Sequence, residues 1–187
     1  MSDRSILFID GENLLIRFEA MVDEGRKPTE STIHKPGDYV WHDKFQEIHK
    51  IRPYRILYYN AKQGDDDALE NHRRELATLE YAVSNNEFRE KAAVTPKVFK
   101  KEKNKAKTKS VDINLTTDLL RHAMNGSIDR AIVISGDGDY IPVYEEAMRH
   151  GVRVTVGALS SGLNNLILTT VDFFKDLDDI LFHKANA

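Results

Sequence analysis

Short, nearly continuous apolar runs alternate along this chain with longer segments that carry apolar residues at helical spacing. The runs lie at residues 4–9, 55–59, 130–135 and 152–156. Their length and continuity are typical of strands buried on both faces of a parallel sheet. Residues 11–24 and 110–124 are predicted to be helices between such strands. The alternation predicts a three-layer α/β/α fold with a mainly parallel central sheet and right-handed connections.

The remaining segments are predicted from weaker patterns. Residues 38–50 are predicted to form a helix with Val40, Trp41, Phe45 and Ile48 on its apolar face. A long helix is predicted from Gly64 to about residue 83, where the aspartates at 65–67 cap free N–H groups rather than bind metal. A strand is predicted at 87–94, a lysine-rich loop at 97–109, and a helix at 138–149.

Length and composition favour one soluble domain that spans residues 1–187. The chain has 187 residues, 41% hydrophobic and 30% charged, and we see no internal repeat or dividing linker. No apolar run approaches the roughly 20 residues of a membrane helix, and the first strand starts too early for a secretory signal. We therefore expect a cytoplasmic protein without membrane contact. The absence of cysteine excludes disulfides, thiolate zinc sites and a cysteine nucleophile.

Acidic residues follow two of the predicted strands. Asp10 closes the first run, and Asp137 and Asp139 follow the run at 130–135 in the motif Ser-Gly-Asp-Gly-Asp-Tyr. In open α/β sheets ligands bind outside the carboxyl ends of the strands, where the strand order reverses. If the two strands are neighbours, these carboxylates project from one edge, and a hard divalent cation would relieve their repulsion. The sequence therefore predicts a Mg²⁺ or Mn²⁺ site.

Two further polar residues have a structural and a functional interpretation. Asp112 lies in the first turn of the helix at 110–124, where an acid ordinarily complements the helix dipole. It also lies on the flank of that helix's buried stripe, which favours a place near the site. Asn13 follows Asp10 by one helical turn, so its amide could orient a metal-bound water or Asp10 itself.

The segment 97–109 carries seven lysines against one glutamate, a local charge of +6 in a chain of net charge −3. A basic strip on an otherwise acidic body suits a polyanion, because lysines that neutralise phosphates release counterions. A solvated loop is the alternative. Its position just before Asp112 favours substrate contact. The candidate substrate-binding residues are Lys100, Lys101, Lys103, Lys105, Lys107 and Lys109.

Three motifs in this order resemble a NYN domain, the PIN-like nuclease branch that includes the LabA-like bacterial proteins. They are Asp-Gly-Glu-Asn-Leu from Asp10, Lys-Ser-Val-Asp ending at Asp112, and Ser-Gly-Asp-Gly-Asp-Tyr from Ser135. The resemblance runs from residue 4 to about 179. It implies a PIN-like sheet and a Mg²⁺- or Mn²⁺-dependent ribonuclease. Asp10, Asp112, Asp137 and Asp139 would be the metal ligands, and Asn13 a supporting catalytic residue.

Such an enzyme would hydrolyse RNA phosphodiester bonds with a water activated by the metal, and single-stranded DNA is a second possible substrate. Two alternatives stay open: a non-catalytic RNA- or protein-binding module on this fold, and a haloacid-dehalogenase-like phosphatase. The phosphatase expects Asp-x-Asp, whereas this chain has Glu12 and then Asn13 after Asp10. The tyrosines Tyr58, Tyr59 and Tyr140 could stack on bases but more often belong to a core. Apolar residues at 163–174 suit core packing or a homodimer.

Overall fold

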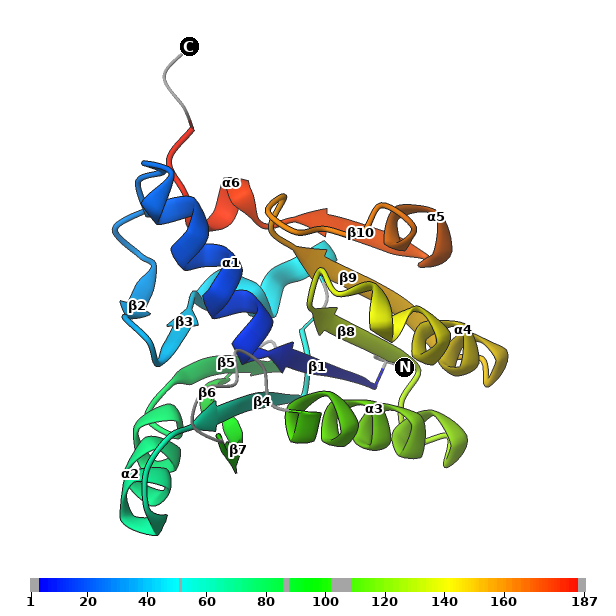
Figure 1. Ribbon diagram of the computed structural model, residues 1–187. Coiled ribbons are helices and arrows are strands. Elements are labelled where there is room, and N and C mark those ends of the chain that lie inside the picture. The colour runs from blue at the N-terminus through cyan, green and yellow to red at the C-terminus, as the bar shows by residue number, and fades with distance from the viewer. Residues whose placement is uncertain (1–3, 51, 86–87, 102–108, 185–187) are drawn as a thin grey trace.

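The centre of the molecule is a six-stranded sheet whose strands all run parallel (Figure 1). The computed structural model describes residues 4–50, 52–85, 88–101 and 109–184. The strand order is β10-β9-β8-β1-β4-β7. The bounds are β1 Ser5–Asp10, β4 Arg55–Lys62, β7 Thr95–Lys100, β8 Arg130–Ile134, β9 Arg153–Ala158 and β10 Phe173–Asp176. The chain first builds outwards from β1 to β7 and then returns to β8, so the strand order reverses between β1 and β8.

Helices cover both faces of this sheet, which confirms the predicted three-layer fold. Helices α1 (Gly11–Asp23) and α2 (Asp66–Leu76) pack on one face, and α3 (Lys109–Met124) and α4 (Ile141–Arg149) on the other. Short helices complete the structure: η1 Asp43–Lys50, η2 Gly138–Tyr140, α5 Ile167–Thr170 and α6 Asp178–Leu181. Within the described residues, no helix combines the length and the apolar character that crossing a membrane requires.

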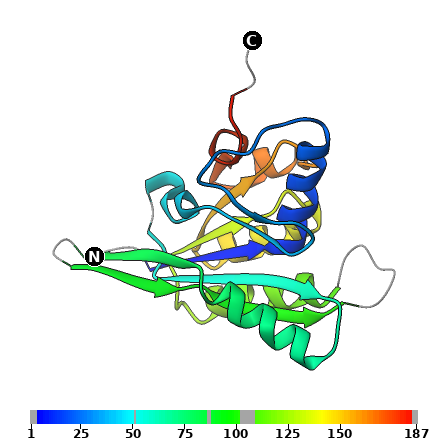
Figure 2. The ribbon, with the colours of Figure 1, turned by 90° about the vertical axis from the view of Figure 1, so that its left-hand side faces the viewer.

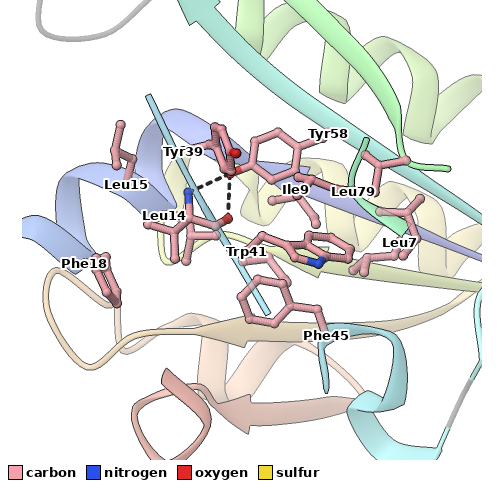
Figure 3. Close-up of a cluster of buried hydrophobic side chains, with 14 of the residues drawn as sticks. Leu7, Ile9, Leu14, Leu15, Phe18, Tyr39, Trp41, Phe45, Tyr58 and Leu79 are labelled. Atoms are coloured by element: carbon pink, nitrogen blue, oxygen red, sulfur yellow. Dashed lines mark hydrogen bonds between the residues drawn. The ribbon is translucent and has the colours of Figure 1, made fainter. Parts of the chain in front are cut away.

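The central strand β1 supplies both cores, because its side chains point alternately to the two faces. Leu7 and Ile9 pack in the cluster under α1, whereas Ile6 and Phe8 pack in the cluster under α3 and α4. Figure 3 shows the first cluster, in which the buried Tyr58 hydroxyl donates to the carbonyl of Val40 at 2.9 Å. This tyrosine is therefore a core residue with a satisfied hydroxyl.

The helix predicted at 38–50 is wrong in its first part. Residues Ile33–Lys35 and Tyr39–Trp41 instead form a hairpin, β2 and β3, and only Asp43–Lys50 is helical, as η1. The missed signal is Pro36-Gly37 between the two strands, since Gly37 takes a φ of 70°, which glycine adopts readily. The apolar residues still share one core, because the Trp41 and Phe45 rings meet edge to face at 5.8 Å.

Two other boundaries differ from the prediction. Helix α2 ends at Leu76 rather than near residue 83, and Glu80–Asn85 forms β5, which pairs antiparallel with β6, Phe88–Ala93. Figure 2 shows this hairpin extending away from the sheet. No glycine or proline marks the end of α2, so long-range pairing decides it. The first residues of the predicted lysine loop belong to strand β7, Thr95–Lys100, which pairs with β4.

Candidate metal centre at the carboxyl edge of the sheet

Asp10 lies where β1 ends and α1 begins, and it is 1% exposed. Its Oδ1 accepts a hydrogen bond from the backbone N–H of Asn13 at 3.0 Å and so caps α1. Its Oδ2 accepts from the hydroxyl of Ser135 at 3.1 Å and from that of Tyr140 at 3.3 Å. These contacts hold one carboxylate in a fixed orientation where the strand order reverses.

The hydroxyl of Tyr140 joins two acids that are distant in sequence. It lies 3.0 Å from Asp112 Oδ1 as well as 3.3 Å from Asp10 Oδ2. A phenol has one hydrogen, so it donates to one of the two carboxylates at a time. Asp112 is half-buried in the first turn of α3, as predicted. The side chains of Asp10 and Asp112 therefore meet at one buried hydroxyl.

The turn after β8 brings in the third acid. The backbone N–H of Asp137 donates to Ser135 Oγ at 3.2 Å, and the same hydroxyl donates to Asp10. The Oδ1 of Asp137 accepts from the backbone N–H of Asp139 at 3.1 Å and caps η2. Asp139 itself is exposed at the rim, and the contact that ties it to this turn is made by its backbone.

The hydroxyls of the two tyrosines that follow this turn are affected by the charges of the nearby aspartates. Tyr144 stacks on Tyr140 with the ring centroids 6.2 Å apart. Burial raises the pKa of both hydroxyls well above the usual value; the charges of Asp10 and Asp112 add to this for Tyr140, and those of Asp10 and Asp137 for Tyr144. Both phenols therefore stay protonated at neutral pH, and Tyr140 acts as a hydrogen-bond donor. The charges of Asp10, Asp112 and Asp137 thus all raise the pKa of a hydroxyl in this pair of tyrosines.

Asn13 is at this centre, but its contact differs from the prediction. Its Oδ1 accepts from the backbone N–H of Gly136 at 3.2 Å, so the side chain braces the acidic turn, while its backbone N–H holds Asp10. Its Nδ2 is buried and has no hydrogen-bond partner among the described residues. A small cavity of about 10 Å³ lies beside it, lined also by Arg17 and Ser135. That volume is about what one water molecule requires.

Two glycines in the motifs lie close to neighbouring groups, Gly11 to a backbone oxygen and Gly138 to the end of a side chain. A Cβ on Gly11 would lie 2.7 Å from the carbonyl oxygen of Tyr59 and closer still to the Tyr58 ring. A Cβ on Gly138 would collide with the side chain of Asn164, whose backbone N–H donates to Gly136 at 3.0 Å. The glycines thus let α1 and the acidic turn approach β4 and the loop after β9.

Ser135 and Tyr140 are the residues of this centre that sequence reasoning missed as site residues. Both belong to the motif that singled out Asp137 and Asp139, so their signal was present in the spacing. Serine and tyrosine are not typical metal ligands, so their residue types did not mark them as part of a metal site. Their function here is to hold the acids, which becomes visible once β1, β8 and α3 are placed.

The predicted lysines lie in part at the same edge. Lys100 ends β7, Lys101 follows it, and Lys109 begins α3. The Nζ of Lys101 lies 2.9 Å from Oε1 of the buried Glu12. Lys103, Lys105 and Lys107 lie outside the described residues. Contact of these lysines with a substrate stays a prediction.

The tightest group of possible metal ligands in the described residues lies elsewhere. Ligand atoms of Asp38, His72 and Glu75 all lie within 4.8 Å of one another, which no three of the predicted aspartates achieve in the described part of the chain. Two ammonium groups already compensate these carboxylates: Lys62 contacts Asp38, and Lys35 lies 3.1 Å from Asp38 and 2.6 Å from Glu75. A cation would have to displace both lysines, so charge balance favours an ionic network at this place.

The ionisation of this network follows from burial and its neighbours. Burial alone would raise the pKa of Asp38, but hydrogen bonds from Lys62 and Lys35 outweigh it, so the pKa lies below its usual value. The His72 side chain is 3% exposed. Burial lowers the pKa of its imidazole below 6.5, and the charges of Asp38 and Glu75 only partly oppose this effect.

We expect His72 to make the fold less stable in mild acid. The unfolded chain binds the imidazole proton at pH values where the folded chain does not. The free energy of unfolding therefore has its full value above about pH 6.5 and decreases as the pH falls below it. In His72→Gln, whose side chain can still accept from Asn60, the decline between about pH 6.5 and 5.5 should be shallower by up to about 1.4 kcal/mol per pH unit. Urea unfolding at several pH values measures this. An equal slope in both proteins would contradict it.

Comparison with solved structures supports the fold. The crystal structure of VPA0982, a protein of unknown function from Vibrio parahaemolyticus, matches with a TM-score of 0.62 and 16% sequence identity over 97% of each chain. At that identity the likeness concerns the fold alone. The comparison with curated proteins gives no match.

The parallel sheet and its helices define an α/β domain of the PIN-like type, with acidic residues where the strand order reverses. The family model described as the NYN domain matches residues 4–175, so the chain belongs to the NYN domain family. This family is part of the PIN-like nuclease superfamily. The predicted resemblance to the NYN domain is thereby confirmed, whereas the LabA-like branch stays a prediction.

Proposed function

We propose that this protein is a metal-dependent ribonuclease that hydrolyses RNA phosphodiester bonds at the centre formed by Asp10, Asp112 and Asp137. The observation that carries the proposal is the buried Tyr140 hydroxyl, which contacts the carboxylates of Asp10 and Asp112. Three carboxylates gathered at a parallel-sheet edge are the oxygen donors that Mg²⁺ and Mn²⁺ prefer. Membership of the NYN family supports nuclease chemistry.

The residues of this centre fit a hard divalent ion. Asp10, Asp112 and Asp137 would hold it, with Asp139 near the rim as a further acid. In the described part of the chain, no three of these aspartates lie as close together as Asp38, His72 and Glu75. A looser arrangement suits Mg²⁺, because this ion takes few protein carboxylates and retains water. When bound, such an ion supplies positive charge against the charged transition state of phosphodiester hydrolysis and lowers the pKa of a coordinated water.

The chain's own residues would position the reactants. Tyr140 and Ser135 orient the Asp10 carboxylate, and Asn13 braces the turn that carries Asp137. Lys100, Lys101 and Lys109, at the same edge, would contact the RNA backbone on either side of the scissile bond without reading bases. No side chain needs to act as the nucleophile.

The structure argues against the phosphatase alternative. An aspartyl-phosphate mechanism expects a second aspartate two residues after Asp10 as the proton donor, and this chain has Glu12 at that position. The acid that follows, Glu12, is salt-bridged to Lys101 and buried, so it is poorly placed to donate a proton.

The test is cleavage of labelled single-stranded RNA with Mg²⁺ or Mn²⁺ and with chelator. We expect cleavage by the wild type with metal, and none with chelator. Binding of RNA without cleavage in every metal tried would favour the non-catalytic binding module. The same assay with single-stranded DNA reports whether the sugar matters.

Replacement of Tyr140 by phenylalanine should weaken Mn²⁺ binding and cleavage about tenfold, because the carboxylates of Asp10 and Asp112 lose the donor that orients them. The matched control is Tyr144→Phe, since the buried Tyr144 hydroxyl has no hydrogen-bond partner among the described residues. Mn²⁺ titration followed by electron paramagnetic resonance measures the affinity. Equal effects of the two variants would show that Tyr140 has no special role.

A further inference from the structure

A polar cavity of about 340 Å³ lies beside the candidate metal centre. Its volume is within the range of small-ligand sites. Glu12, two residues after Asp10 on the first turn of α1, forms part of its wall. Its lining includes Glu12, Ile16, Asn60, Lys62, Gln63 and Lys101.

The cavity is built by elements that meet at the carboxyl edge of the sheet, together with Gly37 from the turn between β2 and β3. The first turns of α1 form one wall, the end of β4 forms the floor, and Lys101, directly after β7, closes the far side. Figure 1 shows that α1 begins at the end of β1 and that β4 and β7 lie on the side of β1 away from β8. A strand of RNA that crosses the metal centre from β8 towards β7 would therefore reach this cavity next.

Two lysines line the cavity, and each is paired with a carboxylate. Lys101 Nζ lies 2.9 Å from Glu12 Oε1, and Lys62 is paired with Asp38. Their side chains are 22% and 32% exposed, and each ammonium group contacts a buried carboxylate. An ammonium group carries three N–H donors, and it can contact a phosphate without giving up its carboxylate.

The uncharged polar groups at the cavity are Asn60 on its floor and Gln63 at its opening. The Nδ2 of Asn60 donates to the carbonyl of Asp38 at 2.6 Å and contacts His72 Nε2 at 3.1 Å, while its Oδ1 accepts from the N–H of Ala61 at 2.8 Å. This amide is therefore locked. Gln63 is exposed at the opening and carries an amide with both donor and acceptor atoms, which suits the edge of a base.

We propose that this cavity is a nucleotide subsite, which receives one nucleotide of single-stranded RNA next to the phosphodiester held at the metal centre. Lys101 and Lys62 contact its phosphate, and Gln63 faces its base. The inference rests on the proposed ribonuclease function and adds a binding position to it. Recognition of an unpaired base in a pocket, rather than of a duplex, makes single-stranded RNA the substrate class.

Ile16 offers a test that leaves both lysine pairs in place. It is half-buried on α1 and lines the cavity, and Ile16→Glu adds a negative charge there, whereas Ile16→Gln adds a neutral side chain of the same length. The third variant, Met124→Glu, places the same charge on the exposed end of α3. Binding of a fluorescent five-nucleotide RNA is measured in chelator, so that the metal centre adds no cation and no cleavage occurs.

The subsite predicts that Ile16→Glu raises the Kd about tenfold, Ile16→Gln changes it less than about threefold, and Met124→Glu leaves it unchanged. Equal Kd values for wild type and Ile16→Glu, or no RNA binding by the wild type in chelator, would overturn the subsite. Tight binding of free AMP with no RNA binding would assign the cavity to a small ligand and overturn it as well.

The two proposals fail in different ways. If Ile16→Glu weakens RNA binding but the wild type never cleaves RNA in any metal, the subsite stands and the ribonuclease proposal fails. If the wild type cleaves RNA with metal and Ile16→Glu neither binds nor cleaves less well, the ribonuclease proposal stands and the subsite fails.

Discussion

Replacement of Asp10 by asparagine is expected to lower metal-dependent RNA cleavage by about a thousandfold while the protein stays folded. The change removes the negative charge that would hold the cation but keeps the shape of the side chain. Asparagine caps helices about as well as aspartate, so the contact to the Asn13 N–H that starts α1 is retained. The amide nitrogen takes the place of Oδ2 and can donate to the hydroxyl oxygen of Ser135 or Tyr140, while Tyr140 can donate to Asp112. Loss of activity should therefore come without loss of the fold.

The control for this variant is Asp23→Asn, which removes an exposed acid at the other end of the same helix. It should cleave RNA at the wild-type rate. Initial rates in Mn²⁺, together with thermal unfolding, separate a lost charge from a damaged fold. Activity of Asp10→Asn within about tenfold of the wild type would mean that this carboxylate is not a metal ligand.

Replacement of Gly11 by alanine is expected to destabilise the protein by about 2–3 kcal/mol and to reduce activity with it. The added Cβ would lie 2.7 Å from the Tyr59 carbonyl oxygen and would overlap the buried Tyr58 ring. Neither neighbour can move easily, because Tyr59 belongs to the central sheet and the Tyr58 hydroxyl is bound to Val40. The start of α1 must then shift, and Asp10 is the residue that precedes it.

The control for this variant is Gly25→Ala, after the end of α1. Gly25 has a φ of 94°, but a Cβ there meets nothing within 4 Å, so the cost is backbone strain alone, about 1 kcal/mol. Denaturant unfolding of both variants measures the difference. A cost for Gly11→Ala no larger than that for Gly25→Ala would show that the contact with β4 yields easily.

The parallel sheet could be predicted from the sequence because its strands are buried on both faces and therefore appear as short apolar runs. The same pattern located Asp10 and Asp137, since each follows the end of such a run. Strands β1 and β8 are neighbours, with Ile9 beside Ile134, so Asp10 and Asp137 follow at the same edge of the sheet. Ser135 contacts both of these residues. Asp112 was predicted more weakly, and its contact with Tyr140 shows why it belongs to this edge.

The hairpins could not be predicted from periodicity. Val40 and Trp41 have the spacing of a helix face with Phe45, and only the turn at Gly37 distinguishes the strand that precedes η1. The strand β5 follows α2 without a helix-stop residue, and its pairing with β6 is a long-range effect. The contacts of Tyr140 and Ser135 depend on three separate elements and are likewise invisible in a linear pattern.

Among the described residues two places could hold a divalent cation, and they differ in how their acids are already compensated. At Asp38, His72 and Glu75, Lys35 and Lys62 already neutralise the carboxylates. At Asp10, Asp112 and Asp137, hydroxyl and backbone donors orient the acids. A cation should therefore prefer the second place, although the first has the closer ligand atoms.

The most direct measurement is the anomalous scattering of a crystal soaked in Mn²⁺. We expect a peak between the carboxylates of Asp10, Asp112 and Asp137, and its loss in Asp10→Asn. A peak at Asp38, His72 and Glu75 with none beside Asp10, or no peak at either place, would contradict the metal centre and the ribonuclease function proposed from it.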